Sequence, residues 1–128
     1  MTDGHPIFLI GFMGTGKSTL GRALMPLMPG WSFVDLDVAA EQRLGCSATE
    51  AFGRFGAETF RMAEAEALAD IAKGGKVVVA CGGGTPCHGR NMELMLETGT
   101  VVRLTAAMER LLRRLEEADG QRPLLAGL

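Results

Sequence analysis

Short apolar runs alternate along the chain with longer segments whose apolar residues recur at helical spacing. Four apolar runs predict strands, at residues 7–10, 31–36, 77–81 and 100–104. Five amphipathic segments predict helices, at residues 17–25, 37–44, 58–73, 91–97 and 106–118. Strands that alternate with helices predict βαβ units, and therefore an α/β fold with a parallel sheet covered on both faces.

The segment 58–73 is the longest of these predicted helices. Its apolar positions recur at helical spacing and are Phe60, Ala63, Ala67, Leu68 and Ile71. Its expected polar face holds Arg61, Glu64 and Glu66. Ahead of it, Ser47 or Thr49 is placed to cap a shorter helix that carries Phe52 and Phe55.

The first predicted strand runs directly into residues 11–18, GFMGTGKS, which match the phosphate-loop pattern G-x-x-x-x-G-K-[ST] at every fixed position. Glycines let backbone N–H groups turn inward around phosphate oxygens, and the helix that starts near Lys17 directs its positive dipole end at the same charge. The candidate nucleotide-binding residues are Gly14, Thr15, Gly16, Lys17, Ser18 and Thr19. Lys17 would reach the β- and γ-phosphates, Ser18 would offer its hydroxyl to Mg²⁺, and Thr19 would support the α-phosphate. The alternative is a glycine-rich turn whose lysine faces solvent.

Two aspartates, Asp35 and Asp37, lie two apart at the end of the second predicted strand, in the stretch FVDLD. Residues two apart on a strand project to the same side, so we expect both carboxylates to face the phosphate loop. One would serve a metal ion and the other would meet a substrate hydroxyl, because charge neutralisation and orientation of the nucleophile are separate tasks in phosphoryl transfer. The alternative is that the two aspartates only cap the next helix.

Arg61 and the glycine triplet Gly82, Gly83 and Gly84 are candidates for binding a second substrate. An arginine at the start of a helix can hold a carboxylate through two parallel N–H bonds. It can equally pair with Glu58 or Glu64 at helical spacing. Three successive residues without Cβ permit close approach of a ligand to backbone amides, although a tight turn before Pro86 would also use them.

Basic residues near the end of the chain are further candidates. Arg122, in QRPLL, could close over transferring phosphates, or it could be a solvated arginine beside a proline turn. Arg114 could stack on a nucleotide base, but RLLRRLEEADG mostly has the pattern of an exposed helix face. His5 and His88 have no companions at metal-ligand spacing, and we treat both as ordinary polar residues.

Composition narrows the class of protein. The 128 residues suit one domain, 47% of them are hydrophobic, and the net charge of −2 does not favour nucleic acid or an acidic membrane surface as a partner. The three cysteines are odd in number and lack C-x-x-C spacing, which suits a reducing compartment. MTDGHP does not begin a secretory signal, and no apolar run approaches the ~20 residues of a membrane span. We therefore expect a cytoplasmic monomer that acts on a small molecule.

Five segments together resemble the shikimate kinase family: GFMGTGKSTLGRAL, FVDLDVAAEQRLGCS, FGAETFR, the strand with GGG, and RPLL. They occur in that family's order and approximate spacing over nearly the whole chain. The resemblance implies a three-layer α/β/α phosphate-loop kinase fold of the nucleoside-monophosphate-kinase type. It also implies ATP-dependent phosphorylation of the 3-hydroxyl of shikimate, with ATP and Mg²⁺ bound.

The resemblance also assigns roles to single residues. Asp35, with Ser18, would hold Mg²⁺, and Asp37 would orient or deprotonate the shikimate hydroxyl. The residues placed around shikimate and ATP would be Arg61 on the shikimate carboxylate, Gly82, Gly83 and Gly84 along the same pocket, Arg122 on the ATP phosphates, and Arg114 near adenine. Asp37, Lys17 and Arg122 would be the catalytic residues.

Shikimate kinases continue well beyond RPLL. We therefore expect residues 1–128 to be a single kinase domain in which a lid begins, at about residues 116–128, without the family's last strand, C-terminal helix and second carboxylate-binding arginine. One alternative is another small-metabolite kinase of the same fold, such as a gluconate kinase. A second is a nucleotide-binding module or a GTP-driven switch without small-molecule catalysis. The guanine-recognition pattern N-K-x-D, which would support a switch, is absent from the sequence.

Overall fold

The computed structural model describes residues 4–11 and 17–105, together with Arg110 and Arg114. Within them, four parallel strands form one sheet in the order β2-β3-β1-β4. The strands are β1 (Ile7–Ile10), β2 (Ser32–Asp35), β3 (Val77–Ala80) and β4 (Thr100–Arg103). The predicted parallel sheet is therefore confirmed, and each observed strand lies within a run that the hydrophobic pattern indicated.

Helices connect the strands. They are α1 (Lys17–Leu24), α2 (Leu36–Leu44), α3 (Ala48–Phe55), α4 (Ala57–Ala72) and α5 (Asn91–Thr98), with short 3₁₀ turns η1 (Met25–Leu27) and η2 (Thr85–Cys87). For α1, α2, α4 and α5 each predicted end differs from the observed one by at most one residue. In the helix expected over residues 106–118, the two described residues, Arg110 and Arg114, have helical backbone. The remainder of that helix and the expected lid lie outside the described residues.

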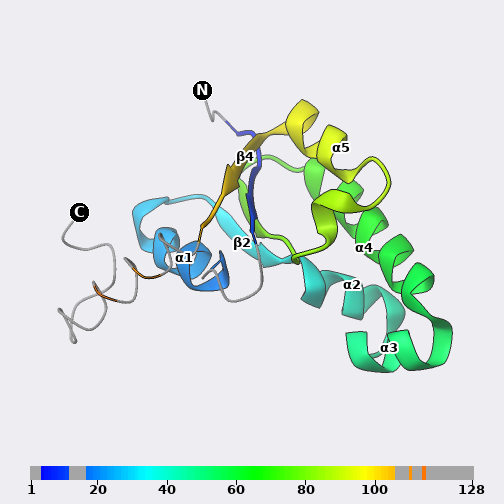
Figure 1. Cartoon of the computed structure of the whole chain (residues 1–128). Helices are drawn as coiled ribbons and strands as arrows, with labels where there is room; N and C mark the ends of the chain where they lie inside the picture. Colours follow the sequence, from blue (N-terminus) through cyan, green and yellow to red (C-terminus); the bar gives the residue numbers. More distant parts are fainter. Residues whose placement is uncertain (1–3, 12–16, 106–109, 111–113, 115–128) are drawn as a thin grey trace.

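The helices cover the two faces of the sheet, which gives the three layers expected (Figure 1). On one face α1 packs so closely that a Cβ added at Gly21 would lie 2.1 Å from Cε1 of Phe33 on β2. The other face carries α4 and α5, seen on the opposite side of the strands from α1. Because strand side chains alternate, Phe8 and Val79 face this second layer.

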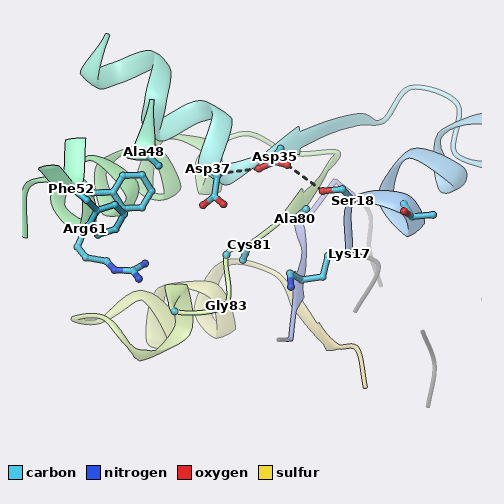
Figure 2. Close-up of a pocket in the computed structure, with 14 residues that line it drawn as sticks. Lys17, Ser18, Asp35, Asp37, Ala48, Phe52, Arg61, Ala80, Cys81 and Gly83 are labelled. Carbon is cyan, nitrogen blue, oxygen red and sulfur yellow. Dashed lines mark hydrogen bonds between the residues drawn. The ribbon is translucent and has the colours of Figure 1, made fainter. Parts of the chain in front are cut away.

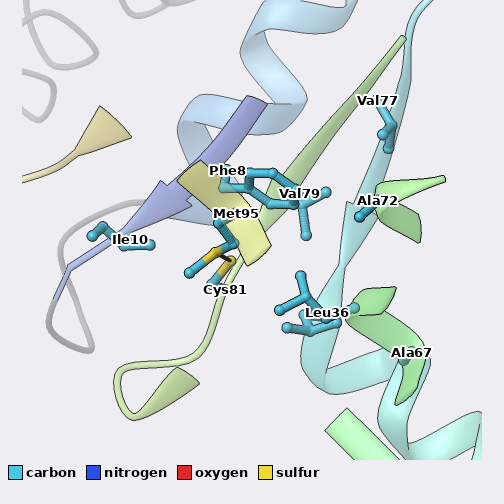
Figure 3. Close-up of a cluster of buried hydrophobic side chains, with 10 residues drawn as sticks. Phe8, Ile10, Leu36, Ala67, Ala72, Val77, Val79, Cys81 and Met95 are labelled. Atoms are coloured by element: carbon cyan, nitrogen blue, oxygen red, sulfur yellow. Dashed lines mark hydrogen bonds between the residues drawn. The ribbon is translucent and has the colours of Figure 1, made fainter. Parts of the chain in front are cut away.

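The main core lies between the sheet and the α4–α5 layer (Figure 3). Its central residues are fully or almost fully buried: Phe8, Leu36, Leu68, Val79, Cys81 and Met95. A second, smaller cluster joins α2, α3 and α4 through Ala40, Ala51, Phe60 and Ala63. The main core therefore holds α4 against the sheet, and the second cluster holds α2, α3 and α4 together.

Helix ends follow the local sequence. Gly45 ends α2 with φ 74°, a left-handed conformation that glycine adopts readily. Ser47, and not Thr49, then caps α3 in a reciprocal arrangement with Glu50, whose backbone N–H donates to the Ser47 hydroxyl at 3.1 Å. These two ends reverse the chain between α2 and α3 and place α3 beside the start of α4.

Candidate active site

A pocket of about 780 Å³ lies where β2 and β3 end and α1 begins (Figure 2). In a parallel sheet the carboxyl ends of the strands meet at one edge, which is where ligands bind in open α/β folds. Nine of the predicted site residues line this pocket: Lys17, Ser18, Thr19, Asp35, Asp37, Arg61, Gly82, Gly83 and Gly84. The structure therefore brings together residues that are up to 67 positions apart in the sequence (84 − 17).

The phosphate-loop end of the pocket is built by the start of α1. Nζ of Lys17 donates a hydrogen bond of 2.8 Å to the carbonyl oxygen of Gly11. Partial burial lowers the pKa of Lys17, and the nearby negative groups, including Asp37 and Asp35, oppose that shift. The predicted Gly14, Thr15 and Gly16 lie outside the described residues.

Asp35 connects the start of α1 to the start of α2. Its Oδ2 accepts from the Ser18 hydroxyl at 3.2 Å. Its Oδ1 accepts from the backbone N–H of Asp37 at 3.0 Å and more weakly from that of Val38 at 3.5 Å, so Asp35 is the N-cap of α2. The capping alternative is thus correct for Asp35, and the same carboxylate also faces the pocket.

The prediction that Asp35 and Asp37 share one side of a strand is wrong. β2 ends at Asp35, and Asp37 lies in the first turn of α2. The helix starts earlier than expected because the Asp35 carboxylate satisfies its first free N–H groups. Both side chains reach the pocket all the same, since the tight strand-to-helix junction keeps them together.

Asp37 lies between the two ends of the pocket, with Lys17 on one side and Arg61 on the other (Figure 2). Burial is the largest cause that raises the pKa of Asp37 above 3.8, followed by the charges of Asp35, Glu64 and Glu41. Arg61 acts in the opposite direction. A carboxylate with a raised pKa is a better proton acceptor than an ordinary aspartate.

Arg61, on α4, faces the three successive glycines 82–84, here called the glycine segment, and is held by Glu64. Its Nη1 donates to Oε1 of Glu64 at 2.9 Å, so the pairing with Glu64 is confirmed and the guanidinium still lines the pocket. A Cβ added at Gly84 would lie 2.6 Å from Nη2 of Arg61, and one added at Gly82 would lie 3.0 Å from Oδ1 of Asp37. The absence of side chains at Gly82 and Gly84 therefore leaves room for Asp37 and Arg61 in their observed positions.

The prediction that Glu64 lies on the polar face of α4 is wrong. The side chain is 0% exposed and accepts a hydrogen bond of 2.8 Å from the Thr85 hydroxyl on the far side of the glycine segment. The sequence did carry a signal for this, because position 64 falls in the apolar stripe of the helix, four residues after Phe60 and four before Leu68. A charged residue within an apolar stripe indicates a buried and partnered group.

The remaining wall of the pocket is apolar. Phe52 and Phe60 pack with ring centroids 4.9 Å apart at 31°, and Ala48 lies beside them. Cys81 lines the floor, where burial raises the pKa of its thiol to about 12, so that it stays neutral near pH 7. Cys46 and Cys87 are likewise free thiols.

Two further predicted residues, Arg114 and Arg122, lie near the end of the chain. Arg122 lies outside the described residues. Arg114 is exposed and is not among the described residues that line the pocket, so its role near adenine stays a prediction.

In the described ranges there is no helix long and apolar enough to cross a membrane.

One known protein family matches this chain over most of its length. The family model for shikimate kinase matches residues 13–128. The chain belongs to the shikimate kinase family. Membership agrees with the parallel sheet flanked by helices. It also agrees with the pocket, which is lined by Lys17, by both Asp35 and Asp37, and by Arg61.

Individual shikimate kinases cover the chain almost completely. The shikimate kinase of Geobacter sulfurreducens is 45% identical over 124 residues, which are 97% of this chain and 67% of that protein. The shikimate kinase of Moorella thermoacetica is 46% identical over 121 residues, which are 94% of this chain and 69% of that protein. The relatives are thus longer than this chain, as the motifs led us to expect.

Solved structures of the family have the same fold. The crystal structure of shikimate kinase from Bacteroides thetaiotaomicron matches with a TM-score of 0.75 at 41% identity, over 97% of this chain and 70% of that one. Shikimate kinase from Acinetobacter baumannii, solved in complex with shikimate, matches with a TM-score of 0.77 at 34% identity, over 98% and 69%. The phosphate-loop kinase fold is therefore established on both sequence and structure.

Proposed function

We propose that the chain transfers the γ-phosphoryl group of ATP to the 3-hydroxyl of shikimate, giving shikimate 3-phosphate and ADP. Membership of the shikimate kinase family supports this reaction. The observation that carries it is the order of side chains in one pocket, where Asp37 lies between the phosphate-loop Lys17 and the guanidinium of Arg61 (Figure 2). That order matches a substrate with a carboxylate at one end and a reacting hydroxyl nearer the nucleotide.

Arg61 is the residue that binds the shikimate carboxylate. Guanidinium and carboxylate form charge-assisted, paired hydrogen bonds, and Arg61 keeps Nη2 directed at Gly84 while Nη1 is held by Glu64. The phenyl rings of Phe52 and Phe60 offer an apolar surface to the shikimate ring. Gly82, Gly83 and Gly84 let the ring approach the backbone between these groups.

Asp37 orients the 3-hydroxyl and accepts its proton. The hydroxyl oxygen forms a bond to the γ-phosphorus as the bond from that phosphorus to the β–γ bridging oxygen breaks, and the electron pair leaves with ADP. Lys17 stabilises the negative charge on the phosphate oxygens, and Thr19 contributes a hydroxyl at the same end of the pocket. Arg122 completes the phosphate contacts from the lid.

Ser18 and Asp35 would hold Mg²⁺. Their oxygens lie 3.2 Å apart, and a hydroxyl and a carboxylate are the hard donors that Mg²⁺ accepts alongside phosphate oxygens and water. The described residues contain no group of three His, Cys, Asp or Glu side chains arranged for a metal. When bound, Mg²⁺ supplies charge neutralisation at the phosphates.

A coupled assay of ADP release with shikimate tests the proposal, with gluconate as the competing acceptor and ³¹P NMR to detect a phosphate monoester. Separate titrations with ATP and with shikimate accompany it. We expect transfer to shikimate, none to gluconate, and binding of both ligands. Transfer to gluconate alone would favour another metabolite kinase, and binding of ATP without binding of shikimate would indicate a nucleotide-binding module.

A further inference from the structure

Three residues with buried polar side chains, behind the glycine segment, are connected by successive hydrogen bonds. They are Glu64 on α4, Thr85 at the start of η2 and Asn91 at the start of α5, with exposures of 0%, 0% and 4%. Nδ2 of Asn91 donates to the carbonyl oxygen of Thr85 at 3.0 Å, and the Thr85 hydroxyl donates to Oε2 of Glu64 at 2.8 Å. Glu64 then accepts from Arg61 through its other oxygen at 2.9 Å. The chain of contacts therefore leads from α5 to the guanidinium in the pocket.

We propose that Thr85 is a positioning residue for substrate recognition: its hydroxyl fixes the Glu64 carboxylate, which in turn holds Arg61 toward the glycine segment. The inference rests on the proposed function, since it assumes that Arg61 binds the carboxylate of shikimate. Thr85 itself does not line the pocket. It acts through Glu64.

Burial makes the Glu64 carboxylate dependent on its partners. A buried carboxylate with an unpaired oxygen carries a large desolvation cost, so it rotates toward another donor when one is lost. Each Oε of Glu64 has its own donor here, Arg61 on one and Thr85 on the other. Without the Thr85 hydroxyl, Oε2 would compete with Oε1 for the guanidinium and turn Arg61 away from the pocket.

The location of Thr85 connects this effect to the reacting end of the pocket as well. A Cβ added at Gly82 would lie 3.4 Å from Oγ1 of Thr85, 3.5 Å from Oε2 of Glu64 and 3.0 Å from Oδ1 of Asp37. The backbone N–H of Thr85 also donates to the carbonyl oxygen of Gly82 at 3.2 Å. Thr85 thus closes the turn that shapes the glycine segment and orients the carboxylate behind it.

A purely structural role for Thr85 makes a different prediction. If the hydroxyl only stabilised the packing of α5 against α4, its loss would lower the melting temperature and reduce the active fraction without changing affinity for one substrate. If it positions Arg61, the loss raises KM for shikimate and leaves KM for ATP and kcat unchanged, because only uniform binding of the carboxylate is weakened.

The test compares Thr85→Val with Thr85→Ser, which restores the hydroxyl, and with Thr98→Val as a matched control. Thr98 is a partly buried threonine whose hydroxyl donates to the carbonyl oxygen of Leu94 at 2.7 Å, within α5. Steady-state kinetics with each substrate varied, calorimetric titration with shikimate and thermal unfolding are measured for all four proteins. Should Thr85→Val not fold, Thr85→Ala removes the same hydroxyl and is held to the same expectation.

We expect Thr85→Val to raise KM and Kd for shikimate roughly tenfold, the loss typical of a hydrogen bond to a charged group. Thr85→Ser and Thr98→Val should match the wild type within about twofold. The methyl ester of shikimate adds a second comparison. Because the ester lacks the charge that Arg61 binds, wild type and Thr85→Val should bind it equally.

Two outcomes overturn the inference, and they are distinguishable. If the wild type binds and phosphorylates shikimate while Thr85→Val has the same KM, or loses affinity equally for the ester, Thr85 does not act through Arg61. If the wild type does not bind shikimate at all, the proposed function fails and the inference fails with it.

Discussion

The guanidinium of Arg61 occupies the space that a side chain at residue 84 would need. A Cβ added at Gly84 would lie 2.6 Å from Nη2 and 3.1 Å from Cζ of Arg61. Gly84 has φ −94°, a value open to every residue, so glycine contributes space here and not conformational freedom. The position of Arg61 and the absence of a side chain at residue 84 therefore go together.

Gly84→Ala should displace Arg61 and weaken the binding of shikimate. We expect KM for shikimate to rise roughly tenfold, equivalent to the loss of one charge-assisted hydrogen bond, while KM for ATP stays unchanged. Steady-state kinetics with each substrate varied measure both values. Gly53→Ala on α3 is the matched control, because a Cβ there meets nothing within 4 Å. An unchanged KM for shikimate in Gly84→Ala would show that Arg61 can give way without loss.

Much of the fold followed from local pattern. Apolar runs such as residues 7–10 and 77–81 predicted strands, and the helix predicted over residues 37–44 ends at its expected residue, where Gly45 is the C-cap. The phosphate-loop motif and the paired aspartates also predicted one pocket, because carboxyl ends of parallel strands share an edge. Regular periodicity and glycine conformation are local properties, and for that reason a single sequence conveys them.

The errors arose where a side-chain contact decides the outcome. Strand alternation did not apply to Asp35 and Asp37, because the Asp35 carboxylate caps α2 and Asp37 already lies in that helix, as the helical pattern over residues 37–44 predicted. The burial of Glu64 depends on Thr85, 21 residues later, whose hydroxyl reaches it only after the glycine segment has turned. Residue spacing gives no direct measure of such partners, and the interruption of the apolar stripe at Glu64 was the only local indication.

Asp37→Asn should abolish most of the phosphoryl transfer while leaving nucleotide binding intact. The amide is similar in size to the carboxylate but cannot accept the proton of the 3-hydroxyl, so we expect kcat to fall by about 10²- to 10⁴-fold. The affinity for ATP, measured by titration, should stay the same because Lys17 and Ser18 are unaltered. Asp70→Asn is a suitable control, since Asp70 is exposed and pairs with Arg43 away from the pocket. Wild-type turnover in Asp37→Asn would rule out the proposed role.

The observed role of Asp35, capping α2, and its proposed role, holding Mg²⁺, can be separated by two substitutions. Asparagine is as good an N-cap as aspartate, so Asp35→Asn should keep the free energy of unfolding, whereas Asp35→Ala should lower it by about 1 kcal/mol. Both variants lose the negative charge next to Ser18 and should require more Mg²⁺ for half-maximal activity. Denaturant unfolding and Mg²⁺ titrations after chelation measure the two effects. The assignment of Asp35 to the metal fails if Asp35→Asn retains the Mg²⁺ dependence of the wild type.

The acid side of the pH profile should report the environment of Asp37. A proton acceptor must be deprotonated, so kcat/KM falls as the pH drops through the pKa of Asp37, which burial and the neighbouring carboxylates raise above 3.8. Glu41 is one of these neighbours, and its Oε2 accepts from the backbone N–H of Ala48 at 2.7 Å, a bond that a glutamine oxygen can keep. Glu41→Gln therefore removes a charge without removing an acceptor, which lowers the pKa of Asp37 and moves the acid limb to lower pH. Glu66→Gln, at an exposed position of α4 that does not act on Asp37, should leave the limb in place. A limb that stays fixed or moves to higher pH in Glu41→Gln would mean that another group accepts the proton.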